Sequence, residues 1–189
     1  MTYVVTTEPS VEPLTLSELK DVLRITTSDF DTELTRLLTA SRRQVEHDSL
    51  RRLITQTVKL YLDGFPVEKE IEIRQAPVQS VTSVTYVDTA GDTQTLSAAD
   101  YHVDTIREPA RVALKTNKNW PETESNTPNA VVVEFVGGYG DAGSDVPAEA
   151  RLAVQQWAMN EWGDCSDSST SDAYKRLIAA LRWTEYHKT

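Results

Sequence analysis

The spacing of apolar residues divides the chain into helical and strand-forming parts. Between residues 16 and 49, apolar side chains recur every three to four positions, which is typical of helices with one buried face. We therefore expect helices over 16–24 and 29–49. Thr15 and Glu18 have the spacing of a capping box at the first helix, and Ser28 is the expected cap of the second. The apolar stripe of the second helix consists of Phe30, Leu34, Leu37, Leu38, Ser41 and Val45.

The period then falls to two, which indicates β-strands over a β-rich insertion at 55–137. Apolar Val58, Leu60 and Leu62 alternate with polar or amphipathic neighbours, and turn sequences such as Asp63-Gly64 separate the runs. The run 131–136 is apolar on both faces, so we expect it at the centre of a sheet. Further strands are expected near 70–74, 80–88, 93–96, 101–103 and 111–114.

Helical spacing returns after this insertion. Pro147 fits the first turn of a helix over 147–162, and Asp172 is the expected cap of a last helix. Between them, residues 163–171 have the composition of a flexible connector. The last helix carries its apolar stripe on Tyr174, Leu177, Ile178 and Leu181.

Strands grouped between helices predict an α+β fold. We expect a small bundle of about four helices from both ends of the chain, with an inserted antiparallel β-rich lobe. The predicted organisation is an extended N-terminal arm at 1–13, a main domain at 14–162, and a linker with a C-terminal helix at 163–189.

Composition restricts the functional classes. The 39% hydrophobic and 25% charged residues are ordinary for a soluble domain, and no apolar run approaches the ~20 residues of a membrane helix. The first residues lack the pattern of a secretory signal, so we expect cytoplasmic synthesis. With 29 acidic against 19 basic residues the net charge is −10, which disfavours binding to DNA phosphates.

One glycine-rich motif merits a test as a nucleotide site. Gly138, Gly140 and Gly143 match G-x-G-x-x-G between a strand and a helix. However, Pro147 places the expected helix start after the last glycine, and the carboxylates that follow would repel phosphate. We interpret the motif as a turn that needs positive φ.

Other reactive side chains do not cluster in the sequence. His47, His102 and His187 are isolated from one another and from cysteine, so no zinc site is expected. The single cysteine, Cys165, excludes an internal disulfide, and its acidic neighbours disfavour a reactive thiolate. We expect no catalytic residue, no metal and no cofactor.

Two aromatic side chains near the end of the chain have another interpretation. Trp183 and Tyr186 follow the connector, where little sequence remains to bury them. Large aromatic residues are common anchors for a protein partner. The alternative is a last helix that folds back onto its own domain, and the sequence leaves both open.

Several segments together resemble one known family. The segments are LTLSELKDVLRI at 14–25, LITQTVKLYLDGFP at 53–66, APVQSVTSVTYVD at 76–88, GDTQTL at 91–96, YHVD at 101–104, WP at 120–121, PNAVVVEFVGGYGDA at 128–142 and DVPAEARLAV at 145–154. In this order and spacing, over roughly residues 14–162, they are similar to the head–tail connector (head-completion adaptor) proteins of tailed bacteriophages. Residues 163–189 have no such likeness.

The resemblance implies a structural virion protein in the head–tail neck, assembled in the host cytoplasm. Such proteins form a ring, typically of twelve copies, beneath the portal protein, and present a platform for the next neck or tail protein. Genomic DNA would pass through the channel without specific binding, and no membrane would be involved. The alternatives are another neck protein, such as a stopper or tail-side protein, or a small nucleotide-binding enzyme.

The resemblance also implies that the C-terminal segment docks on the portal. The docking candidates are then Tyr174, Leu177, Ile178, Leu181, Trp183 and Tyr186. On this hypothesis, removal of residues 172–189 abolishes portal attachment and leaves the fold intact.

Overall fold

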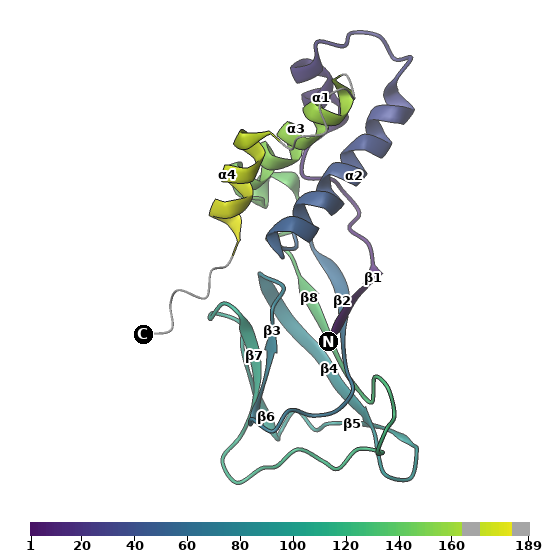
Figure 1. Cartoon of the computed structure of the whole chain (residues 1–189), viewed down its shortest axis with the longest axis vertical. Coiled ribbons are helices and arrows are strands. Elements are labelled where there is room, and N and C mark those ends of the chain that lie inside the picture. Colours follow the sequence, from purple (N-terminus) through teal and green to yellow (C-terminus); the bar gives the residue numbers. More distant parts are fainter. Residues whose placement is uncertain (164–170, 183–189) are drawn as a thin grey trace. The chain divides into compact units, whose positions relative to one another are not determined.

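The computed structural model describes residues 1–163 and 171–182 and confirms the α+β class (Figure 1). The chain forms two compact units: a β unit of residues 1–8 and 55–138, and a helical unit of residues 9–54 and 139–189. In chain order the elements are β1 (Thr2–Thr7), α1 (Leu16–Leu23), α2 (Asp31–Ser49), β2 (Gln56–Leu62), β3 (Glu70–Ile73), β4 (Val78–Val87), β5 (Thr93–Thr95), β6 (Tyr101–Asp104), β7 (Ala110–Leu114), β8 (Val131–Gly137), the 3-10 turn η1 (Gly143–Asp145), α3 (Ala148–Trp162) and α4 (Asp172–Leu181).

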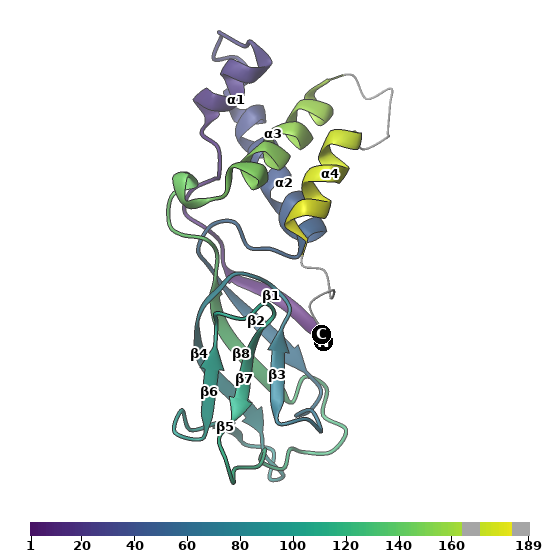
Figure 2. The ribbon, with the colours of Figure 1, turned by 90° about the vertical axis from the view of Figure 1, so that its left-hand side faces the viewer.

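The β unit consists of two antiparallel sheets (Figure 2). One has the strand order β1-β2-β8-β4-β5 and the other the order β3-β7-β6. The prediction of a central strand at 131–136 is confirmed, because β8 pairs with β2 on one side and with β4 on the other. Alternate side chains of these strands enter one apolar core, which includes Val58, Leu60, Ile71, Val112, Val133 and Phe135.

The prediction of an extended arm over residues 1–13 is wrong for its first part. Residues Thr2–Thr7 form β1, which pairs antiparallel with β2, and the Tyr3 ring lies edge-on to Phe135 with centroids 6.3 Å apart. This segment therefore belongs to the β unit. An edge strand buries only one face, and its partner lies about fifty residues further on, so no local pattern reveals the pairing.

The helical unit packs its four helices around a second core. Its largest fully buried side chains include Leu19, Leu34, Val45, Leu53 and Ile54, and small residues of α3 such as Ala150 and Ala158 complete the core. The buried positions follow the predicted helical spacing, except that Phe30 of the predicted α2 stripe precedes the helix and is 45% exposed. The capping box at Thr15 is also confirmed, since its hydroxyl accepts from the Glu18 N–H at 3.2 Å and Glu18 accepts from the Thr15 N–H at 2.8 Å.

Two predicted helix starts differ from the structure. Helix α2 begins at Asp31, with Phe30 at the N-cap position, so Ser28 is not its cap. Helix α4 is capped by Ser171, whose hydroxyl accepts from the Tyr174 N–H at 3.2 Å, while Asp172 lies in the first turn. At α4 two adjacent residues, Ser171 and Asp172, could each cap the helix, and the structure uses the serine. At α2 the N-cap residue Phe30 makes no side-chain cap hydrogen bond.

Candidate partner-binding surfaces

The described residues contain no arrangement that could hold a metal. Across residues 1–163 and 171–182, no three or more His, Cys, Asp or Glu side chains cluster suitably. The His47 side chain is 83% exposed and lies 3.1 Å from Asp48, while Cys165 and His187 lie outside the described residues. In the same part of the chain, each helix is too short or too polar to traverse a bilayer.

The glycine-rich segment forms a tight turn between β8 and η1, and each glycine has a structural reason. Gly138 adopts a φ of 134°, which disfavours any side chain. A Cβ atom on Gly140 would overlap the Asp145 carboxylate. A Cβ atom on Gly143 would lie 2.7 Å from the backbone oxygen of Pro13. Because the positive φ of Gly138 and the close contacts at Gly140 and Gly143 account for all three glycines, the motif alone gives no argument for a phosphate site.

Helix α4 packs on its own unit through the residues that the sequence places on its stripe. Tyr174, Ile178 and Leu181 are buried in the helical core, and Leu177 packs against it at the margin. At the end of α4, the Arg51 guanidinium donates to the backbone oxygen of Leu181 at 2.6 Å. The structure thus shows the fold-back alternative for residues 172–181.

A partly buried hydrogen bond fixes the start of α4 on α2. The Tyr174 hydroxyl donates to Asp48 Oδ2 at 2.7 Å, and Gln44 Nε2 lies 3.0 Å from both oxygens of the same carboxylate. Burial, and secondly the hydrogen bond to this anion, raise the pKa of Tyr174. Burial alone would raise the pKa of Asp48, but hydrogen bonds from Tyr174, Gln44 and His47 outweigh it and lower that pKa.

The proposed docking residues therefore fall into two groups. Tyr174, Ile178 and Leu181 are used inside the helical unit, so removal of residues 172–189 would take core side chains with it. The expectation that this deletion leaves the fold intact must be revised for that reason. Trp183 and Tyr186 lie outside the described residues, and their docking role stays a prediction.

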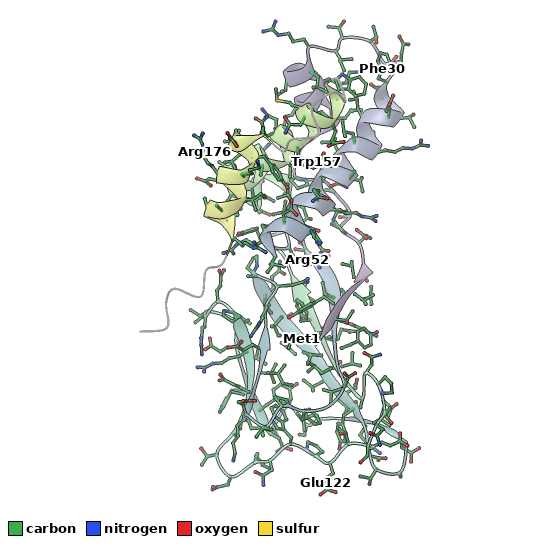
Figure 3. All side chains as sticks on the ribbon, in the orientation of Figure 1. Met1, Phe30, Arg52, Glu122, Trp157 and Arg176 are labelled. Atoms are coloured by element: carbon green, nitrogen blue, oxygen red, sulfur yellow. The ribbon has the colours of Figure 1, made fainter. Side chains whose placement is uncertain are left out.

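The exposed side of α2 and α4 carries an excess of positive charge. We call it the basic face; it consists of Arg36, Arg43 and His47 on α2 and Lys175 and Arg182 on α4. Two adjoining grooves run along it and share His47, and half-buried Trp157 of α3 lines the first. Figure 3 shows Trp157 amid the helices. Among residues 1–163 and 171–182, the one carboxylate lining these grooves is Asp48, whose oxygens accept the hydrogen bonds described above.

A third groove, in which carboxylates outnumber cations, lies between α1 and α3. We call it the α1–α3 groove. Its lining includes Glu18, Asp21, Val22 and Leu152, and Leu152 is 49% exposed although it is aliphatic. Arg151 also lines it and pairs with Glu18 at 2.6 Å, so carboxylates outnumber cations there. The Glu18 pKa is lowered, chiefly by the backbone hydrogen bond from Thr15 and further by Arg151, so this carboxylate is ionised.

The sequence reasoning did not single out either surface. Arg36, Arg43 and His47 are spaced i, i+7 and i+11 on the side of α2 opposite its apolar stripe, so a helical projection reveals them. The net charge of −10 gives no indication of this locally positive surface. The contribution of α4 could not be found from the sequence, because it depends on how α4 packs.

The β unit has an aromatic cluster on its loops. Phe65 and Trp120 stack with ring centroids 4.8 Å apart and planes 5° from parallel, and Tyr86 lies 5.6 Å from Phe65. The Trp120 indole N–H donates to the backbone oxygen of Glu68 at 2.8 Å. These contacts hold the long loop at 116–129 on the sheet, which explains its aromatic residue without a ligand.

The fold has counterparts among solved structures, although no family model and no curated protein matches the chain. A chain of the neck of the empty gene transfer agent particle, computed with C6 symmetry, has a TM-score of 0.79 and 23% identity. A chain of the native particle's virion has a TM-score of 0.78 and 22% identity. A chain of the native particle's neck, computed with C12 symmetry, has a TM-score of 0.79 and 20% identity. Each match covers 97% of this chain and 96% of the other.

These matches show that the chain shares its whole fold, both units included, with chains of a phage-like particle. At identities of 20–23%, the likeness concerns the fold, and function has to be argued from it.

Proposed function

We propose that this protein is a structural subunit of the neck of a tailed-phage-like particle. In this role it forms a ring of identical copies that joins the portal to the next neck or tail protein and extends the DNA channel. The observation that carries the proposal is the match of the entire chain to neck chains of gene transfer agent particles. We also propose that the protein catalyses no reaction and that its surfaces serve only as contacts.

The charge distribution supports a ring through which DNA slides. The β unit has seven basic and thirteen acidic residues, a net charge of 7 − 13 = −6. The helical unit has twelve and sixteen, a net charge of 12 − 16 = −4, and the two sum to the −10 of the chain. A ring of copies with this charge repels phosphates on average, so that DNA moves through it without being held.

We propose that the C-terminal segment attaches the protein to the portal. Since most of the α4 stripe is buried in the helical core, only part of this segment is left for docking. Tyr174, Ile178 and Leu181 hold α4 on the helical unit and thereby fix where the chain continues beyond Arg182. The docking contact itself then falls to Trp183 and Tyr186. Aromatic side chains bury a large area and suit such an anchor.

Electron microscopy of assembled particles tests the proposal. Particles made with the chain should show ring density directly beneath the portal, and labelling of this chain should mark that ring. Particles made without it should have heads that fail to join tails. Absence of the chain from purified particles would overturn the proposal.

The same images separate the alternatives. A stopper or tail-side protein would lie further from the portal, with another ring between them. A nucleotide-binding enzyme would instead gain thermal stability with nucleotide, by about 2.7 kcal/mol at a hundredfold excess over Kd.

A further inference from the structure

The helical unit has two surfaces of opposite charge, and they lie on different sides of it. The basic face belongs to α2 and α4, and the α1–α3 groove belongs to α1 and α3. Figure 2 shows α1 and α4 on opposite sides of α3. The charged side chains of both surfaces are exposed or half-buried. Trp157 also packs against the helical core, and Arg151 pairs with Glu18 within the unit.

A closed ring needs such a pair of surfaces. In a ring of identical subunits every contact is heterologous, so one face of each copy meets a different face of the next. A face that carried the same charge on both sides of the contact would repel its neighbour. We infer that copies of this chain associate head to tail, with the basic face of one helical unit seated against the α1–α3 groove of the next. This inference rests on the proposed ring.

The apolar parts of the two surfaces are complementary as well. Exposed Ala40 and half-buried Trp157 form an apolar floor between the cations of the basic face. In the α1–α3 groove, Leu152 projects as an exposed aliphatic side chain next to Val22 and Asp21. Leu152 seated on the Ala40–Trp157 floor would place Asp21 close to Arg36 and Arg43. A central apolar anchor surrounded by charged groups is the usual arrangement of a specific interface.

The partner that binds the basic face is a second copy of this chain rather than another anion, such as a nucleic acid. The chain itself is acidic, both of its units are net negative, and the α1–α3 groove supplies the missing apolar partner. A nucleic acid would meet the cations of the basic face but would have no use for the Leu152 surface. Substitutions in the α1–α3 groove would therefore leave DNA binding to the basic face unchanged.

Thiol cross-linking tests the contact directly. The substitutions Ala40→Cys and Leu152→Cys are made together in a Cys165→Ser background, both at exposed positions. A short bismaleimide should link neighbouring copies into a ladder of covalent multimers, both in purified particles and in concentrated protein. Either cysteine alone should give no species above a dimer. The absence of a ladder in particles whose necks contain the chain would overturn the inference.

Charge reversal gives an independent test. We expect Arg36→Glu with Arg43→Glu to reduce incorporation into particles at least about tenfold, and addition of Asp21→Lys to restore most of it. The matched control reverses two cations of the β unit, Arg74→Glu and Arg107→Glu, and should have little effect. An equal loss in the control, or no rescue by Asp21→Lys, would contradict the head-to-tail contact; the second result would favour another anion, such as DNA.

The two proposals can fail separately. A ladder from purified protein, together with absence of the chain itself from particles, would contradict the neck function and support the contact. If the chain is present in the neck but forms no ladder of cross-linked multimers, the proposed function is supported and the head-to-tail contact is contradicted.

Discussion

At the scale of single residues, the helical unit contains a buried group of charges. Arg42 and Glu46 are 2% and 3% exposed and lie 3.0 Å apart, one turn apart on α2. Glu12 contacts Arg42 Nε at 2.8 Å, and Glu46 accepts the backbone N–H of Leu53 at 2.9 Å. This group joins the segment before α1 to the segment that follows α2. Buried charges are tolerated when paired in this way, and removal of one partner leaves the other uncompensated.

We predict that Glu46→Ala lowers the free energy of unfolding by about 3 kcal/mol, because Arg42 loses a buried carboxylate and Leu53 loses an acceptor. Urea unfolding of the purified protein measures this. The matched control is Glu33→Ala on the exposed side of α2, which should change stability by no more than about 0.5 kcal/mol. Equal effects of the two changes would show that the network contributes nothing.

A second prediction concerns Tyr174→Phe, which removes the hydroxyl bound to Asp48 and should cost about 1–2 kcal/mol at pH 7. The pKa of Asp48 lies below its usual 3.8 in the folded chain. Its stabilising contribution is therefore complete above that usual value and is lost as the pH falls through the lower folded value. The difference between wild type and variant should accordingly shrink below pH 4, and urea titrations at several pH values check this. A difference that grows in acid would contradict it.

At the scale of elements, the turn between β8 and η1 depends on close backbone approach. We predict that Gly143→Ala destabilises the protein by about 2 kcal/mol, because the new methyl group would meet the backbone oxygens of Pro13 and Glu12 at 2.7 and 3.1 Å. Gly64→Ala is the matched control, since the nearest atom there is Thr123 Oγ1 at 3.9 Å. Chemical denaturation of both variants should rank them in this order.

Elements with a full local pattern were predictable from the sequence. The spacing of apolar residues in α2 and in β8 indicates which positions are buried, and both elements lie as expected apart from Phe30, which precedes α2 and is exposed. Strand β1 was not predictable, because its partner β2 is distant in the chain and only one of its faces packs. The packing of α4 was left open for a similar reason: an apolar stripe shows that a helix is covered but does not identify what covers it.

At the scale of the whole molecule, the two functions assigned to the C-terminal segment can be separated. We predict that a chain ending at Arg182 unfolds at the same urea concentration as the full chain and no longer attaches to the portal. A chain ending at residue 170 should lose at least about 3 kcal/mol, because Tyr174, Ile178 and Leu181 leave the core.

A portal pull-down with Trp183→Ala and Tyr186→Ala in the full-length chain isolates the docking contribution. Attachment that persists in this variant and in the chain ending at Arg182 would defeat the docking proposal without affecting the neck function.

The discontinuity of the helical unit determines when its parts can fold during synthesis. Helices α1 and α2 are translated early, but their core partners on α3 and α4 follow only after the complete β unit. The nascent chain therefore carries the apolar stripe of α2 uncovered while more than eighty residues are added. The β unit, whose last strand ends at Gly137, has all its parts before the first residue of α3 is made. The β unit can therefore fold first during translation. The helical unit, whose segments precede and follow the β unit in the sequence, can be completed only afterwards.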